Sequence, residues 1–279
     1  MKFGLALGGG GARGAAHIGI LAKLEQLGLR PDLVTGTSIG GLVGALIAAG
    51  LNAAEITTVF REMRFGKLYS LPGRKPALTD HNRLEDLLEQ AIGRPTFDEL
   101  QLPLAVMATD LVTRELLALH EGDVISAVLA TTAFPVILPP VQREGRTLID
   151  GGVLNNTPFD VAREMGADYV LAVDLAKSAP YGTPIPYPPG SNIIERFLIR
   201  RQREPIYQAV STMADILTWE NVRVRVAEEP PDLLLRPAVG TVGLFDFHRL
   251  EAGIAAGREA ADSAEEELQK LVARRQATA

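Results

Sequence analysis

The chain contains no cysteine. This absence excludes a disulfide framework, a thiol nucleophile and any zinc site built from thiolates, but it does not fix the cellular compartment. Positive charge is not in excess either, because 28 Lys and Arg residues accompany 34 Asp and Glu residues, for a net charge of −6. An acidic chain of this kind is not expected to bind nucleic acid through bulk electrostatics.

Long apolar runs are missing as well. No stretch reaches the roughly 18–20 apolar residues that a membrane span needs. Residues 1–7 are too few for the apolar core of a signal peptide. Hydrophobic residues nevertheless make up 47% of the 279 positions, enough for one substantial core. We therefore expect a soluble cytoplasmic protein, and we leave contact with a membrane surface and the oligomeric state open.

Strand-like and helix-like segments alternate through the first two-thirds of the chain, which predicts a mostly parallel sheet with helices on both faces. We expect a catalytic core over residues 1–175, then a C-terminal flap and helical extension (176–279) packed on the same domain. The flap begins with a Pro- and Tyr-rich segment at 178–191. The expected strands are 2–7, 32–35, 104–111, 115–120, 169–173 and 233–236, with a hairpin at 141–149. The expected helices are 15–27, 41–50, 53–63, 82–92, 123–131, 193–219 and one that starts near 247.

The pentapeptide Gly36-Thr37-Ser38-Ile39-Gly40 lies between the second expected strand and an almost wholly apolar helix. Gly-x-Ser-x-Gly at a strand-to-helix junction is typical of a nucleophile elbow, in which a strained turn exposes the serine Oγ. Glycine suits positions 36 and 40 because a Cβ there would collide with the turn or with the start of the helix. Ser38 is therefore the candidate nucleophile, with a plain tight turn as the competing interpretation.

A second glycine-rich segment, Gly8 to Gly14, joins the first strand to the first helix. It matches G-x-G-x-x-G, but a dinucleotide site needs an acidic residue at the end of the second strand, and positions 33–54 hold no Asp or Glu. No Lys-Ser or Lys-Thr pair closes the loop, so a phosphate-binding P-loop is also disfavoured. Free backbone N–H groups at a helix start can instead hold an oxyanion if the loop faces Ser38. Arg13 has two open roles, a positive charge near that anion or a structural salt bridge.

A serine nucleophile needs a proton acceptor within hydrogen-bond reach. In chain order, an α/β-hydrolase triad would use Ser38, Asp150 and His248. His248 lies in a helix-start sequence of the C-terminal region, and the other three histidines are expected to be structural. Asp150 is the better candidate to act directly, because it ends an apolar run and Gly151 and Gly152 let the backbone turn. We expect its carboxylate at an open strand edge.

Three motifs, in this order and spacing, closely resemble those of the patatin-like phospholipases, including bacterial members related to neuropathy target esterase. They are Gly9-Gly10-Gly11-Ala12-Arg13-Gly14, Gly36-Thr37-Ser38-Ile39-Gly40 and Asp150-Gly151-Gly152. The resemblance implies a three-layer α/β/α patatin-like fold with a Ser38–Asp150 dyad that works without histidine. It also implies oxyanion donors in the loop from Gly9 to Gly14, lipid acyl esters as substrates, and no metal or other cofactor.

Two other classes of function compete with a lipid-acyl hydrolase. One is a regulatory or scaffold protein that keeps the fold without turnover, and the other is a nucleotide-dependent oxidoreductase. Apolar residues flanked by arginines at 193–201 suit an interfacial contact with anionic lipid, although an amphipathic core helix has the same pattern. The sequence does not reveal the acyl-chain length, the head group or the positional preference.

Overall fold

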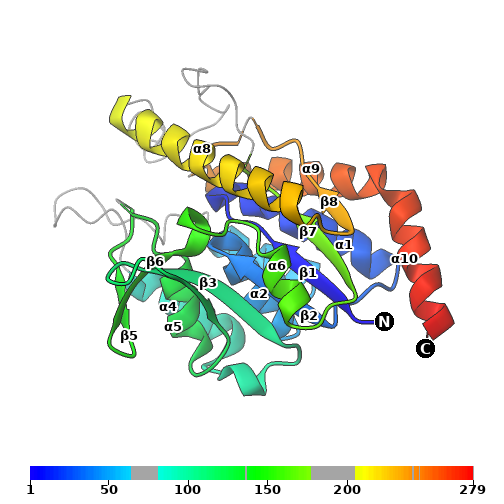
Figure 1. The fold of residues 1–279 in the computed structure, drawn as a ribbon, viewed down its shortest axis with the longest axis horizontal. Coiled ribbons are helices and arrows are strands. Elements are labelled where there is room, and N and C mark those ends of the chain that lie inside the picture. The colour runs from blue at the N-terminus through cyan, green and yellow to red at the C-terminus, as the bar shows by residue number, and fades with distance from the viewer. Residues whose placement is uncertain (64–80, 136, 177–204, 241, 245, 279) are drawn as a thin grey trace.

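The computed structural model describes residues 1–63, 81–135, 137–176, 205–240, 242–244 and 246–278. These residues form three layers, with helices on both faces of one eight-stranded sheet (Figure 1). The predicted three-layer α/β/α fold with mostly parallel strands is therefore confirmed. The Pro- and Tyr-rich segment 178–191 and the arginine-flanked segment 193–201 lie outside the described residues.

Five parallel strands form the centre of the sheet, in the order β3-β2-β1-β7-β8. The antiparallel strand β4 and the β5–β6 hairpin join this sheet at β3. The strands are β1 (Phe3–Leu7), β2 (Leu33–Thr37), β3 (Leu104–Asp110), β4 (Leu116–Leu119), β5 (Val141–Arg143), β6 (Arg146–Asp150), β7 (Tyr169–Val173) and β8 (Leu233–Leu235).

One edge of β3 carries two strands in succession. Met107 pairs with residues of both β2 and β4, whereas Ala108 pairs with residues of both β4 and β6. A strand residue has one neighbour on each edge, so β4 occupies one edge and β2 and β6 share the other. Since β6 runs antiparallel to β3, the end of β2 at Thr37 and the end of β6 at Asp150 meet head to head.

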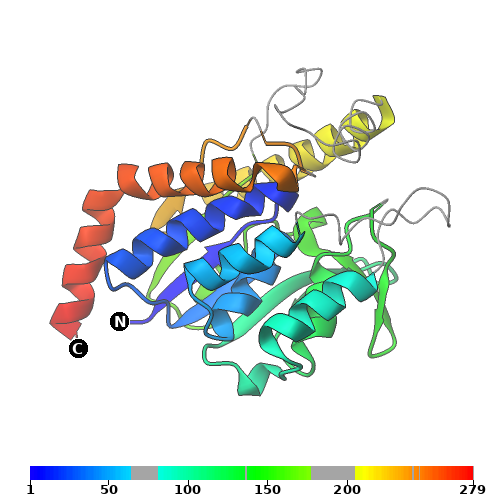
Figure 2. The same cartoon turned by 180° about the vertical axis from the view of Figure 1, so that it is seen from behind.

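Helices cover the two faces of the sheet unequally. On one face, α2 (Ile39–Ala48) and α5 (Val124–Thr131) contact the strands directly (Figure 2). The same layer contains α1 (Ala15–Gln26), α3 (Ala53–Glu62), α4 (His81–Ile92) and α9 (Leu250–Ser263), and α10 (Glu265–Thr278) follows α9 at the edge of the molecule. On the opposite face lie α6 (Phe159–Glu164) and the long α8 (Pro205–Glu228), as Figure 1 shows.

Residues of β1 alternate between two cores, and this alternation fixes the strand that leads into the glycine-rich loop. Phe3, Leu5 and Leu7 belong to the larger core, whereas Ala6 packs with Phe159 in the smaller one. Complete burial of a leucine or phenylalanine side chain stabilises a fold by about 1.5–3 kcal/mol. The larger core therefore supplies most of the free energy that holds β1 in the sheet.

Three predicted elements have the wrong limits. The helix predicted to end at position 219 continues to Glu228. The prediction ended it too early because valine and arginine alternate over 222–226, a pattern that is typical of a strand. The single helix expected from 247 is a 3₁₀ turn, η5 (Phe247–Arg249), followed by α9 and α10 with a break at Ala264. The helix expected from 41 begins at Ile39. The prediction placed the start too late because the first turn contains glycines, which are poor helix formers. We did not predict α6, which has only 6 residues and no readable helical period.

Within the described ranges, no helix combines sufficient length with an apolar composition to cross a bilayer.

Candidate active site

Ser38 lies at the sharp turn between β2 and α2, with φ 55° and ψ −127°. Only glycine adopts this backbone conformation without strain. A Cβ on Gly36 would lie 2.4 Å from the carbonyl oxygen of Gly40, so the turn closes only with glycine at position 36. The Ser38 N–H donates to Thr131 Oγ1 at 2.9 Å, and the Thr131 hydroxyl donates to the Met107 carbonyl. These bonds anchor the strained turn to β3.

Asp150 ends β6 beside this turn. Its carboxylate accepts a hydrogen bond from the Gly152 N–H at 2.8 Å, and it lines the same cavity as Ser38. Asp150 is 2% exposed, unlike the open strand edge that we expected, because β6 runs antiparallel to β3 and carries its last residue inward. Burial raises the pKa of Asp150 to about 6, and the nearby Ser38 side chain and the Gly152 N–H oppose this rise.

Gly151 lets the chain cross β3 directly after Asp150. A Cβ at this position would lie 2.5 Å from the carbonyl carbon and oxygen of Met107, so a larger residue would push the turn away from β3. The chain then passes over β2, where Thr37 Oγ1 donates to the Asn155 carbonyl at 2.8 Å. The turn that carries Asp150 is therefore held against the same two strands as the turn that carries Ser38.

The glycine loop, which we define as residues 8–14, approaches Ser38 from the end of β1. A Cβ on Gly9 would lie 3.1 Å from the Ser38 Cβ. The Gly9 N–H donates to the Asn156 carbonyl at 3.0 Å. The N–H groups of Gly10 and Gly11 have no hydrogen-bond partner among the described residues, and both glycines line the same cavity as Ser38. These two N–H groups are available to bind a negative oxygen there.

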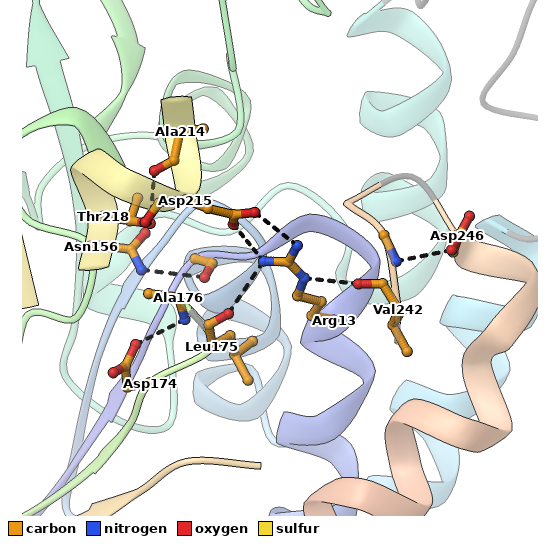
Figure 3. A network of polar contacts seen from close by, with 12 residues as sticks. Arg13, Asn156, Asp174, Leu175, Ala176, Ala214, Asp215, Thr218, Val242 and Asp246 are labelled. Carbon is orange, nitrogen blue, oxygen red and sulfur yellow. Dashed lines mark hydrogen bonds and ion pairs between the residues drawn. The ribbon is translucent and has the colours of Figure 1, made fainter. Parts of the chain in front are cut away.

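Arg13 is held by residues from distant parts of the chain. Its guanidinium forms a bidentate ion pair with Asp215 of α8, at 2.7 and 3.2 Å (Figure 3). Arg13 Nε donates to the Val242 carbonyl at 2.9 Å. Of the two roles left open by the sequence, the structure contains the salt bridge, and Arg13 also lines the cavity.

No histidine lines this cavity in the part of the chain that the structure describes. His248 lies in η5, from which Phe247 contributes to the wall. His17 Nε2 is 2.8 Å from the Gly8 carbonyl oxygen, which makes it a structural support of the glycine loop. Burial lowers the pKa of His17 to about 4, and the hydrogen bond to Gly8 opposes the fall. His17 is therefore neutral at pH 7.

The cavity above Ser38 and Asp150 has a volume of about 260 Å³. Its wall is formed largely by apolar side chains of α2, α8 and the loop after α5, among them Ile39, Leu42, Phe134, Leu138, Met213 and Leu217. An apolar chamber with a few polar groups at one point is the usual form of a site for a hydrocarbon ligand. Across the described ranges, no three His, Cys, Asp or Glu side chains lie together as metal ligands would.

We did not predict three residues of the site, namely Thr131, Asn156 and Asp215. Asn156 is 2% exposed and lines the cavity, and its Nδ2 donates to the Gly9 carbonyl at 3.4 Å. The run Asn155-Asn156-Thr157-Pro158 just after the Asp150 motif is a readable signal, because asparagine and proline are both typical of turns. Thr131 and Asp215 lie inside helices, and nothing in their local sequence marks them.

Comparison with known proteins relates the chain to one protein family. Residues 5–163 match the family model described as patatin-like phospholipase. An uncharacterized NTE family protein of Mycobacterium tuberculosis is 31% identical over 278 residues, which cover 94% of this chain and 46% of that protein. Patatin-like phospholipase domain-containing protein 6 of Homo sapiens is 34% identical over 179 residues, or 61% of this chain and 13% of that protein. The chain thus spans about half the length, or less, of these relatives.

A solved structure resembles most of the chain. The crystal structure of VipD from Legionella pneumophila superposes with a TM-score of 0.57 at 14% identity, covering 94% of this chain and 67% of that one. At this identity the likeness concerns the fold alone. The family model, by contrast, covers more than half of the chain and includes the glycine loop, Ser38 and Asp150. The chain therefore belongs to the patatin-like phospholipase family.

Proposed function

We propose that this chain is a serine lipid-acyl hydrolase, acting as a phospholipase, lysophospholipase or carboxylesterase, with Ser38 as nucleophile and Asp150 as its base. The observation that carries this proposal is that Ser38, on its strained turn, and the buried Asp150 carboxylate line the same apolar cavity, where the Ser38 side chain favours the ionised form of Asp150. Membership of the patatin-like phospholipase family supports hydrolysis of lipid esters.

In the first half-reaction, Ser38 Oγ attacks the carbonyl carbon of the ester while the Asp150 carboxylate accepts the hydroxyl proton. The negative oxygen of the tetrahedral intermediate accepts hydrogen bonds from the Gly10 and Gly11 N–H groups. A donor of this kind lowers the barrier by roughly 3–4 kcal/mol. Asp150 then gives the proton to the leaving alcohol oxygen as the C–O bond breaks, and an acyl group remains on Ser38.

In the second half-reaction, water attacks the acyl carbon while Asp150 accepts one of its protons. Collapse of the second tetrahedral intermediate releases the fatty acid and returns the proton to Ser38 Oγ. The pKa of Asp150, about 6, suits both steps. The carboxylate is ionised at pH 7, so that it can accept a proton, and it is basic enough to hold that proton during the reaction.

The cavity wall favours a substrate with a hydrocarbon chain. Met213 and Leu217 of α8 line the cavity and are also 55% and 47% exposed. These two side chains give the site an apolar rim, across which an acyl chain can pass from a lipid surface to Ser38. Contact with lipid assemblies is therefore part of the proposed function.

The proposal is tested by hydrolysis of p-nitrophenyl butyrate and lysophosphatidylcholine. We expect Ser38→Ala and Asp150→Asn to lower kcat by about 10³ or more, with an unchanged circular-dichroism spectrum. His248→Ala and the exposed control Ser263→Ala should keep most of the activity. Turnover retained in Ser38→Ala would reject the nucleophile. Loss of activity in His248→Ala, with activity retained in Asp150→Asn, would favour a triad instead.

A further inference from the structure

A buried ion pair connects the glycine loop to α8. Arg13, 2% exposed, belongs to the same loop as Gly10 and Gly11. An unpaired charge at such depth is strongly destabilising, so a buried guanidinium requires acceptors of matching geometry. Asp215 supplies them, with both carboxylate oxygens in hydrogen-bond contact with the fork of Arg13 (Figure 3). A bidentate pair of this kind fixes orientation as well as distance.

The segment 242–244 holds the loop from a second side. Arg13 Nε donates to the Val242 carbonyl, and the Ala12 N–H donates to the Leu244 carbonyl at 2.8 Å. The backbone of Gly11 has φ 56°, and a Cβ there would lie 2.2 Å from the Leu244 oxygen. The peptide groups of Gly10 and Gly11 are thus supported by α8 and by residues 242–244, both of which lie outside the family-matched residues 5–163.

The same helix is bonded to the turn that carries Asp150. Arg225 of α8 donates to the Leu154 carbonyl and to Asp160, each at 3.0 Å, and Asn221 also donates to the Leu154 carbonyl. Leu154 directly follows the 3₁₀ turn η4 (Gly151–Val153), which begins next to Asp150. Asp215 and Arg225 are separated by about 15 Å along the helix axis. α8 therefore spans the distance between the glycine loop and the Asp150 turn.

We propose that Asp215 is a positioning residue of this active site, which through Arg13 holds the Gly10 and Gly11 N–H groups where the oxyanion forms. This inference rests on the proposed function of Ser38. Loss of one oxyanion donor lowers kcat by about 10²–10³. Without the ion pair, the glycine loop should be more mobile and should displace both the Gly10 and the Gly11 N–H groups. We expect this to lower kcat by about tenfold or more. KM for a small ester should stay within about twofold, because the apolar side chains that line most of the cavity are unchanged.

The direct test compares Asp215→Asn with Glu220→Gln on p-nitrophenyl butyrate, a short soluble ester that removes effects of a lipid surface. Asparagine keeps the shape of Asp215 but can no longer accept both hydrogen bonds from Arg13. Glu220 lies on the same helix, and its exposed ion pair with Arg223 touches neither loop. We expect the loss of kcat only in Asp215→Asn. Equal kcat in the two variants would overturn the proposal.

A second variant covers the case in which Asp215→Asn leaves Arg13 uncompensated and does not fold. The double variant Arg13→Met/Asp215→Leu removes both charges, and apolar replacement of a buried ion pair is often neutral for stability. We expect it to fold but to keep the low kcat, because the bond from Arg13 to Val242 is also lost. A wild-type kcat in this variant would show that the Arg13–Asp215 ion pair only stabilises the fold, and it would contradict the proposal.

Hydrogen–deuterium exchange of the peptide covering residues 8–14 gives a readout that does not require turnover. Faster exchange in Asp215→Asn than in Glu220→Gln supports the positioning role, even if no ester is hydrolysed and the proposed function itself fails. Unchanged exchange overturns it. An Asp215→Asn variant that keeps its kcat and has a lower KM for anionic esters would also overturn it, and would reassign Arg13 as a ligand of the substrate.

Discussion

Ser38 and Asp150 lie where β2 and β6 meet along one edge of β3, and both residues line one cavity. β2 reaches this point from one direction and β6 from the other, so the proposed nucleophile and base come from the ends of two strands that meet. The antiparallel course of β6 also explains the burial of Asp150, and burial is the main cause of its raised pKa. Strand direction therefore sets the chemical property that the proposed mechanism needs.

The pH dependence of hydrolysis should report the pKa of Asp150. Only the ionised carboxylate can accept the Ser38 proton, and burial raises the pKa of Asp150 to about 6. We expect kcat/KM for a neutral ester to rise about tenfold per pH unit below that value and to level off above it. Initial rates between about pH 4.5 and 8.5 check this. A midpoint near 4, the range of an ordinary carboxyl group, would contradict the account.

The same burial should make Asp150 a destabilising residue at neutral pH. Its pKa in the folded protein lies above its unfolded value of 3.8. The free energy of unfolding is therefore highest below pH 3.8, where Asp150 is protonated in both states. It falls as the pH rises from 3.8 to about 6, by up to ~3 kcal/mol, because the folded protein disfavours the ionised carboxylate. Asp150→Asn does not titrate, so the variant should be more stable than wild type at pH 8, with a smaller difference at pH 5. Urea unfolding at both pH values measures this, and a difference independent of pH would refute it.

His17 should act in the opposite direction. Burial lowers its pKa to about 4 from the ordinary value of 6.5, so the unfolded chain binds a proton that the folded protein excludes. Stability should fall as pH drops from about 6.5 to 4, by up to ~3 kcal/mol. His17→Gln should lose this part of the pH dependence. His120→Gln, at a side chain that is 60% exposed, serves as the control and should behave as wild type does.

Two glycines with similar φ angles should respond differently to substitution by alanine. Gly11 has φ 56° and no room for a Cβ, whereas Gly28 has φ 67° and nothing within 4 Å. Gly28→Ala should cost about 1 kcal/mol of stability through backbone strain and leave kcat unchanged. Gly11→Ala must also displace the glycine loop from Leu244, and we expect kcat to fall by about tenfold or more. Similar kcat in the two variants would show that Gly11 is not part of the oxyanion site.

Local sequence signals were sufficient for the turns that carry the chemistry. The glycines around Ser38 and the apolar residues of β1 and β7 leave few other conformations, so the strands and the elbow could be predicted. The burial of Asp150 could not, because it depends on β6 sharing an edge with β2, which is a contact between distant segments. The role of Asp215 could not be predicted either, since its partner Arg13 lies 202 positions away in the sequence. No periodic pattern encodes such a pairing.

Labelling with a fluorophosphonate, followed by peptide mass spectrometry, tests the central claim most directly, because the reagent reacts covalently only with an activated hydroxyl group. We predict a single adduct on Ser38 that forms more slowly below about pH 6, and no adduct in Ser38→Ala. An adduct on a different residue, or continued ester hydrolysis by a protein whose Ser38 stays unlabelled, would contradict the account.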